Sequence, residues 1–316
     1  MVSFILRRIF ALCFVLLFAV TFTFCLLRLA PGSPFALGEK QSSPERIAQQ
    51  EWKFDLDRSI PSQCARYLGL WRKNRGDFSG LLEGDLQPCL KYKDRTVTEL
   101  IAQTLPVSAI LGSAALLIAT ISGVWLGALA AVKRATWVDT ATMLGALAAI
   151  SIPTFVTGPA LVLVFSLWLG WLPVGGWGGL TSFILPAITL AGPFIAYIAR
   201  LTRTSLLEVL NQDFVRTARA KGLAESRVIF KHVLKVAILP VVSFLGPLAA
   251  SLLTGSLVIE RVFNLPGMGD FFVNSVLNRD VFLCCGSVAI YCTLLVSMNL
   301  TVDIAYQSLD PRIRLE

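Results

Sequence analysis

The chain has 316 residues, of which 55% are hydrophobic and only 15% are charged, and its net charge is +8. Soluble globular domains carry about 25% charged residues, so this composition excludes a soluble enzyme, a disordered chain and a secreted disulfide scaffold. A positive charge can indicate nucleic-acid binding, but the basic residues here lie in short loops between apolar runs. That distribution is typical of an integral membrane protein, whose loop charges set its orientation.

Apolar runs, taken in chain order, predict six membrane-spanning helices. A helix needs about 20 apolar residues to cross a bilayer, and the segment 1–30 contains the first such run. The region 99–308 contains the other five, which we expect at about 101–132, 138–169, 181–200, 236–259 and 281–303. Two of them share the uncharged stretch 140–199, which glycine, tryptophan and proline residues interrupt at 170–179. The predicted fold class is an all-α membrane protein.

Lysine and arginine residues predict how these helices are oriented. With six spans both termini lie on one side, which holds fourteen basic residues against three in the short loops of the other side. The positive-inside rule then places both termini in the cytoplasm, together with a loop at 201–235 and a tail at 309–316. The segment 31–98, between the first two helices, becomes a small extracytoplasmic platform.

Two of the seven cysteines, Cys64 and Cys89, fall in this extracytoplasmic segment. Extracytoplasmic compartments permit disulfides, so the sequence leaves two alternatives, a Cys64–Cys89 bond or two free thiols. The other five cysteines lie in or beside apolar spans, where cysteine usually behaves as a small hydrophobic residue.

The cytoplasmic loop 201–235 contains a short helical pattern. Gln212 and Asp213 can cap a helix that ends before Gly222, a residue suited to the left-handed conformation that follows helices. The pattern combines one aromatic side chain with small residues and cations. Its residues are Phe214, Val215, Arg216, Thr217, Ala218, Arg219, Ala220, Lys221 and Gly222. An aromatic anchor beside cations can dock a partner protein. The alternative is a solvated basic loop that only obeys the positive-inside rule.

Sequence motifs for catalysis and ATP binding are absent. The only histidine, His232, cannot form a metal cluster alone, and the chain has no Cys-x-x-Cys, H-E-x-x-H, G-x-S-x-G or Walker A motif. Ion-coupled carriers bury ionisable residues within the membrane, whereas Glu260, Asp280 and Asp303 lie only at span ends. We therefore expect a transport subunit that is not an enzyme, holds no cofactor and takes its energy from a partner. A secondary carrier or channel for small solutes is the alternative.

The loop resembles the EAA coupling loop of ABC importer permeases, above all that of the B-type membrane subunit in the dipeptide/oligopeptide/nickel permease family. The matching residues are 216–223, followed ten residues after Gly222 by His232. Arg216-Thr217-Ala218 occupies the generic Glu-Ala-Ala triplet and the generic proline is missing, two departures that resemble the B-type branch. Further segments similar to this family run along the chain, at 29–34, 56–61, 260–269, 278–280, 299–306 and 309–314.

This resemblance implies a type I ABC importer transmembrane domain in the inner (cytoplasmic) membrane of a bacterium, translocating peptides by alternating access. It implies as partners a homologous C-type permease, two ABC ATPase subunits, an extracytoplasmic substrate-binding protein and the lipid bilayer, and no nucleic acid. The ATPase subunits would bind ATP and Mg, and the helix 214–221 would transmit their motion. Such coupling requires that nucleotide and substrate each favour one of two conformations.

Overall fold

The computed structural model describes residues 2–30, 32–35, 43–70, 79–92 and 94–309. These residues form helices, with a single isolated β-bridge between Pro88 and Thr96. Among them four helices are long and apolar enough to cross a membrane, or six if each of two bent helix pairs counts as one span. The predicted all-α membrane fold is confirmed. The six-span count is the upper end of that range, and the orientation stays a prediction.

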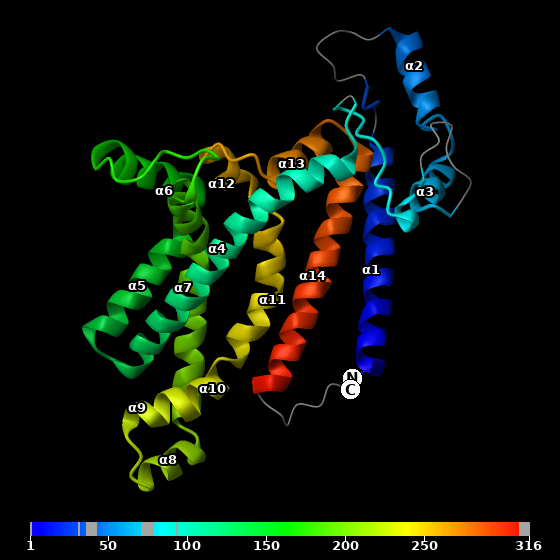
Figure 1. Cartoon of the computed structure of the whole chain (residues 1–316). Coiled ribbons are helices and arrows are strands. Elements are labelled where there is room, and N and C mark those ends of the chain that lie inside the picture. The colour runs from blue at the N-terminus through cyan, green and yellow to red at the C-terminus, as the bar shows by residue number, and fades with distance from the viewer. Residues whose placement is uncertain (1, 31, 36–42, 71–78, 93, 310–316) are drawn as a thin grey trace. The chain divides into compact units, whose positions relative to one another are not determined.

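The chain divides into two compact units (Figure 1). The first comprises residues 108–265 together with the end of the chain from Ser297, and the second comprises residues 2–107 and 266–296. Helices α4 (Val97–Val132) and α14 (Val281–Leu309) contribute to both. The first unit also holds α5 (Trp137–Ser151), α6 (Thr154–Leu161), η2 (Val162–Trp168), η3 (Leu180–Phe183), α7 (Ile184–Leu210), α8 (Asp213–Ala220), α9 (Glu225–Arg227), η4 (Val228–Val233), α10 (Leu234–Ala237), α11 (Leu239–Leu253) and α12 (Leu257–Val262).

In the first unit, α4 and α7 approach each other closely because α4 has glycines at the contact. A Cβ atom at Gly127 would lie 2.4 Å from the carbonyl oxygen of Ala199, and one at Gly123 would lie 2.7 Å from Ile198 Cβ. Small residues one turn apart are a common device by which membrane helices bring their backbones together. α7 therefore packs closely against α4 at these positions, and α5 packs against α7 as well.

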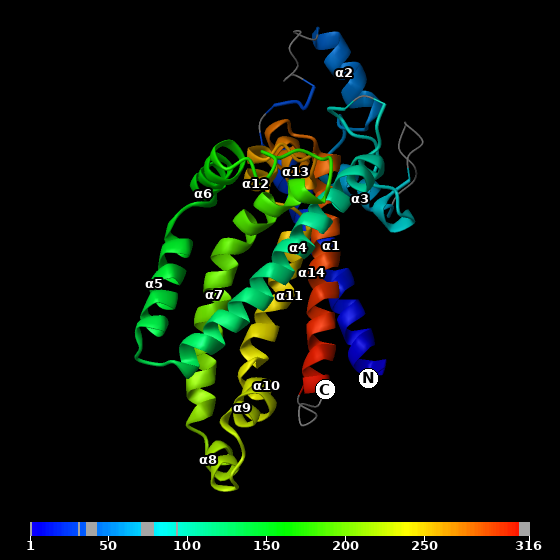
Figure 2. The ribbon, with the colours of Figure 1, turned by 60° about the vertical axis from the view of Figure 1, so that its left-hand side comes forward.

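The helix expected at 138–169 differs from the structure, where it is broken into two parts. α5 ends at Ser151, and the helical segment that begins at Thr154 leaves it at an angle of 105°. Pro153 explains the break, because proline disfavours the helical conformation of the residue before it, and Ile152 is extended at φ −86° and ψ 120°. α5 and α6 are therefore two arms joined at Ile152 and Pro153, as Figure 2 shows.

Other boundaries also differ from the expected ones. α7 continues ten residues past 200, because Thr202, Leu206 and Val209 keep a buried face at helical spacing. The loop expected at 201–235 is thereby mostly helical. The helix expected at 236–259 is interrupted between α11 and α12 at Gly255, whose φ of +101° a helix does not accommodate.

The second unit has a core of its own, formed by α1 (Val2–Leu29), α3 (Ile60–Leu68) and the first turns of α14. Tyr67 lies at its centre, with its ring stacked on Phe282 at 5.7 Å between centroids and tilted on Phe24 at 5.6 Å. The unit also contains α2 (Pro44–Lys53), η1 (Leu81–Glu83) and α13 (Met268–Leu277). The platform expected at 31–98 thus contains short helices, while 310–316 of the expected tail lies outside the described residues.

The Cys64–Cys89 disulfide, one of our two alternatives, is not formed. Both residues are buried free thiols in the core of the second unit, and the Cys89 thiol donates a hydrogen bond to Asp280 Oδ2 at 2.7 Å. The same carboxylate oxygen accepts from the backbone N–H groups of Leu90 and Lys91, at 2.8 and 2.9 Å. Cys89 therefore acts as a hydrogen-bond donor that fixes this loop to the start of α14.

Candidate functional site

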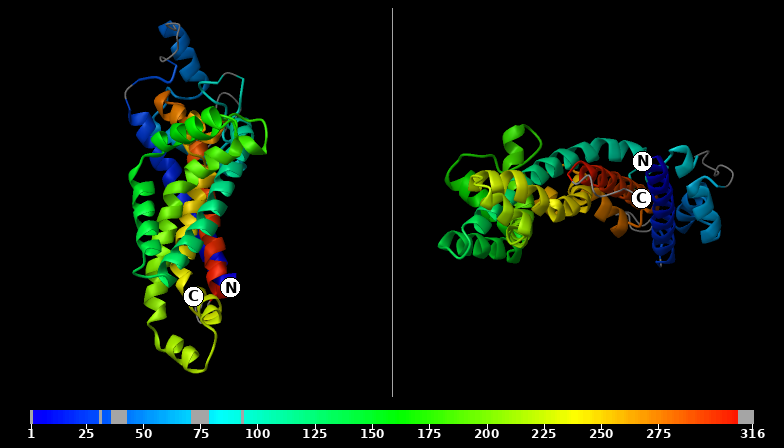
Figure 3. Two further views of the ribbon diagram at one scale, coloured as in Figure 1. Left: turned by 90° about the vertical axis from the view of Figure 1, so that its left-hand side faces the viewer. Right: turned by 90° about the horizontal axis from the view of Figure 1, so that it is seen from below.

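The short helix predicted in the cytoplasmic loop is present as α8, Asp213–Ala220, at the end of the first unit remote from α6 (Figures 1 and 3). Its first turn carries Asp213 and its last turn Arg219, the charges that favour a helix through its dipole. Gln212 occupies the N-cap position with extended backbone, but no side chain caps the helix there. The expected side-chain capping by Gln212 and Asp213 is therefore wrong, although the start of the helix is right.

The C-terminal end of α8 is a Schellman motif built on Gly222. Gly222 has φ +74°, as its predicted role requires. Its N–H donates to the Arg219 carbonyl at 2.9 Å, and the Leu223 N–H donates to the Ala218 carbonyl at 3.4 Å. This pair of bonds satisfies carbonyl groups that the helix end would otherwise leave open. The predicted left-handed termination at Gly222 is confirmed.

One face of α8 packs into the first unit. Val215 is fully buried, and Ala218 and Leu223 pack against the same group of side chains. We call this group the inner-end core; its buried members are Ala131 of α4, Leu206 and Val209 of α7, Val215 of α8, Val228 and Val233 of η4, and Ala237 of α10. α8 and the last turns of α7 therefore share one core.

The other face of α8 is exposed. Phe214, at 39% exposure, presents part of its ring at the surface, and Arg216, Thr217, Ala220 and Lys221 are exposed beside it. Arg219 instead pairs within the chain, since its guanidinium donates to both Glu225 carboxylate oxygens at 3.0 and 2.5 Å. These hydrogen bonds raise the pKa of the Arg219 guanidinium. All three predicted cations of the helix are exposed. Arg219 is engaged by Glu225, and Arg216 lies 3.7 Å from Asp213.

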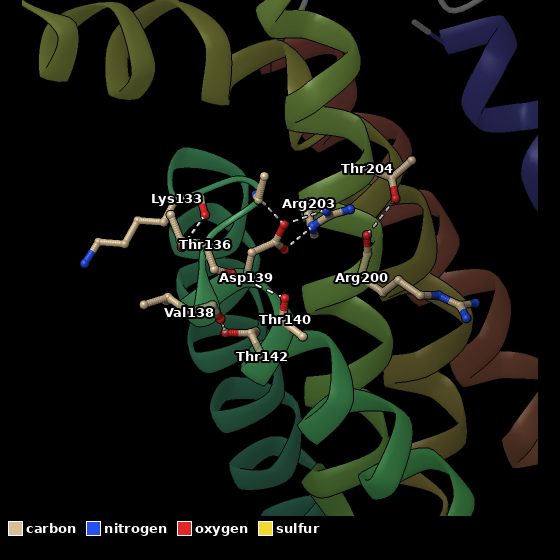
Figure 4. Close-up of polar contacts among 10 residues, drawn as sticks. Lys133, Thr136, Val138, Asp139, Thr140, Thr142, Arg200, Arg203 and Thr204 are labelled. Atoms are coloured by element: carbon tan, nitrogen blue, oxygen red, sulfur yellow. Dashed lines mark hydrogen bonds and ion pairs between the residues drawn. The ribbon is translucent and has the colours of Figure 1, made fainter.

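Sequence reasoning missed an ion pair that lies near this helix. Arg203 of α7 donates from Nε to Asp139 Oδ1 at 2.6 Å and from Nη2 to Asp139 Oδ2 at 2.8 Å, joining α5 to α7 (Figure 4). The backbone N–H of Ala135 donates to the same carboxylate at 3.1 Å. A signal was present, because Asp139 directly precedes the uncharged stretch 140–199 and Arg203 follows it. When such a stretch turns back as two helices, its two charged ends meet.

A second missed contact lies at the opposite end of the first unit. Glu260 of α12 is buried, and its Oε1 accepts from Ser108 Oγ at 2.7 Å and from the Ser256 N–H at 3.2 Å. The sequence placed Glu260 at a span end but gave it no partner. A buried carboxylate with these donors ties α12 to α4 within the unit, which is a structural role.

Comparisons with known proteins agree along the whole chain. Residues 123–315 match the family of binding-protein-dependent transport system inner membrane components, and residues 1–112 match the N-terminal part of that membrane component. Among solved structures, an amino acid ABC transporter crystallised with histidines aligns with a TM-score of 0.51 at 17% identity, covering 67% of this chain and 94% of its own. That likeness shows the fold.

Curated relatives of similar length are transport permeases. The oligopeptide transport system permease protein OppB of Salmonella typhimurium is 46% identical, over 99% of this chain and 100% of its own length. OppB of Escherichia coli K12 is 44% identical over the same shares, and the dipeptide transport system permease protein DppB of Bacillus subtilis is 39% identical over 100% and 99%. The chain therefore belongs to the binding-protein-dependent transport system inner membrane components, as a multi-pass subunit of the inner membrane.

Proposed function

We propose that this chain is the permease subunit of an ATP-driven, binding-protein-dependent importer that moves peptides across the inner membrane. The observation that carries the proposal is the full-length likeness to oligopeptide and dipeptide permeases, at 39% to 46% identity. The chain itself does no bond chemistry in this proposal. Its task is to open a path for the peptide alternately to either side of the membrane.

In this proposal the exposed face of α8 is the docking surface for an ABC ATPase subunit. Phe214 supplies a partly exposed aromatic anchor, and Arg216 and Lys221 supply cations that can pair with carboxylates on the partner. The buried face carries Val215 into the inner-end core, so that a displacement of the docked ATPase moves α7. The ATPase subunits bind ATP and Mg. The energy of ATP hydrolysis reaches this chain through α8.

The remaining partners follow from the same proposal. A homologous C-type permease completes the pathway, two ATPase subunits lie on the cytoplasmic side, and a substrate-binding protein delivers peptide from outside. The experiment is reconstitution of the complete importer in proteoliposomes, with uptake of a labelled pentapeptide, a dipeptide, a free amino acid and Ni²⁺ measured with and without ATP. We expect ATP-dependent peptide uptake that requires the binding protein. Uptake by the chain alone, driven by an ion gradient without ATP, would instead identify a secondary carrier or channel.

A further inference from the structure

The Asp139–Arg203 ion pair joins α5 to α7 at two points and lies close to the inner-end core. Asp139 is 5% exposed, and both of its oxygens are engaged by one guanidinium in a two-point geometry. Such bidentate pairs fix orientation as well as distance, since two parallel hydrogen bonds resist rotation. Arg203 lies one helical turn before Leu206, which is a member of the inner-end core. The pair therefore joins α5 to the same turns of α7 that hold α8.

α5 and α7 also pack against each other beyond this pair. A cavity of about 290 Å³ lies along them, lined largely by small residues that include Ala141 and Gly145 of α5 and Gly192 and Ala199 of α7. Small residues at a helix contact let the two backbones approach closely, so apolar packing already joins α5 to α7. The two hydrogen bonds of the ion pair add to this packing a directional contact that fixes the register of α5 on α7.

The other end of α5 leads to a second contact region. The bend at Ile152 and Pro153 turns the chain into α6, which packs on α12 and on α7. At Gly158 of α6 an added Cβ would lie 3.2 Å from Val262 Cγ1, so this contact is close. α5 is thus joined to α7 by packing and by the ion pair, and to α6 through a break in the helix.

We propose that Asp139 and Arg203 are positioning residues that make α5 move as one body with α7 when α8 is displaced, so that movement at the docking surface reaches α6. The proposal rests on the proposed function, because it assigns to this pair a step in coupling ATP hydrolysis to transport. The contacts form a continuous path from Val215 through Leu206 to Arg203, and from Asp139 along α5 to α6.

A distance measurement tests the rigid connection. Spin labels at Thr140 and Thr204, which are exposed on the two helices beside the pair, are placed in the complete importer in a chain whose exposed Cys13 is replaced by serine. We expect one narrow distance distribution that shifts by less than about 2 Å, the scale of a small helix displacement, between the nucleotide-free and ATP-bound states. Asp139→Asn should broaden it. A larger shift with the pair intact, or a distribution that stays narrow in Asp139→Asn, would overturn the proposal.

Transport measurements separate coupling from folding. We expect Asp139→Asn and Arg203→Gln to insert and to copurify with the ATPase, yet to transport about tenfold less peptide per ATP hydrolysed, within the 5- to 150-fold range of coupling effects. The exchanged variant Asp139→Arg with Arg203→Asp should recover most of the uptake. Arg200→Gln is the matched control, because it removes a cation one turn earlier on α7 without touching Asp139, and it should transport normally.

The outcomes distinguish this proposal from the proposed function. If the unmodified importer shows no ATP-dependent uptake, the proposed function fails, while the spin-label distances still report whether the pair joins α5 to α7. If the unmodified importer transports normally and Asp139→Asn keeps the same peptide-to-ATP ratio, the pair is not a positioning element. Lower uptake that the exchanged variant does not recover, in correctly inserted protein, also counts against it.

Discussion

Two regions outside the long apolar helices use their polar side chains in opposite ways. In the second unit, two carboxylates are buried and paired within the chain, although most charged side chains between α2 and the start of α4 are exposed. Asp55 is 2% exposed and pairs with Arg58 and Arg66 at 3.0 and 2.7 Å, and Asp280 holds Cys89 from the start of α14. In the first unit, the surface of α8 instead leaves Phe214, Arg216 and Lys221 exposed.

This difference separates structural polar groups from those that are available to a partner. A buried carboxylate needs its hydrogen bonds for the fold to be stable, so changing it affects folding first. Exposed side chains contribute little to the stability of their own chain, and so the residues on α8 can be changed to test docking alone. Each prediction below either sharpens this comparison or breaks it.

The largest expected effect is all-or-none and concerns the side of the membrane on which each region lies. A cysteine introduced at Thr181 or Glu83 should react with an impermeant maleimide in intact cells, because both positions are exposed and are predicted to be extracytoplasmic. A cysteine at the exposed Ser226 should react only after permeabilisation. Ser182 is unsuitable as a probe, since the structure buries it. The reverse labelling pattern would contradict both the six-span topology and the comparison.

The next effect concerns the docking surface. Phe214→Asp replaces a partly exposed aromatic anchor with a charge, and we expect peptide uptake to be abolished and ATPase copurification to be strongly weakened. The variant should still insert and unfold at the same temperature, because the ring is not part of the inner-end core. Lys91→Ala, in the predicted extracytoplasmic segment, is the control and should leave ATPase association unchanged. Normal association and uptake in Phe214→Asp would mean that the loop is only a solvated basic surface.

The matching change in the second unit should act on stability. Asp280 is the N-cap of α14, and its Oδ1 accepts from the Leu283 N–H at 3.1 Å. Asp280→Ala removes this cap and leaves the buried Leu90 N–H and the partly buried Lys91 N–H without this acceptor. Loss of a cap and of buried hydrogen bonds together should lower the free energy of unfolding by about 3 kcal/mol. Denaturant unfolding of the purified chain in detergent measures this free energy, and Glu83→Ala, at an exposed position, is the control. A change below about 0.5 kcal/mol would show that this carboxylate has no structural role.

A smaller effect is expected at the end of α8. Gly222 has φ +74°, and an added Cβ would meet no atom within 4 Å, so the cost of Gly222→Val comes from backbone conformation alone. That cost is roughly 1 kcal/mol or more, enough to distort the Schellman end and reduce uptake. Gly222→Asn, which tolerates the left-handed region better, should retain more uptake than valine in the same proteoliposome assay. Equal uptake in both variants would rule out a role for this helix end.

The sequence predicted α8, its exposed aromatic and its glycine end because these depend on local patterns of capping, periodicity and conformation. It did not predict that the expected spans 138–169 and 236–259 would be broken at Pro153 and Gly255, because an apolar run can continue through a bend. The Asp139–Arg203 and Asp280–Cys89 contacts were also missed. They join residues 64 and 191 positions apart. The charges that bound the uncharged stretch 140–199 offered a signal for the first contact, but no pattern along the chain pairs Asp280 with Cys89.

The smallest effect concerns the reactivity of Cys89. Its pKa is raised to about 12, first because burial disfavours the thiolate and then because the Asp280 carboxylate lies beside it. At pH 8 only about one molecule in ten thousand then carries the reactive thiolate, so iodoacetamide should leave Cys89 unmodified in the folded chain and modify it fully in SDS. A cysteine introduced at the exposed Glu83 serves as the reactive control. Because burial is the larger cause, Asp280→Asn should lower the Cys89 pKa only in part and speed alkylation modestly in whatever fraction remains folded. Two results would contradict this prediction: a peptide linking Cys64 to Cys89 in non-reducing mapping, or rapid alkylation of Cys89 in the native protein. Either would show that Cys89 is not the buried donor to Asp280 on which the comparison of the two regions depends.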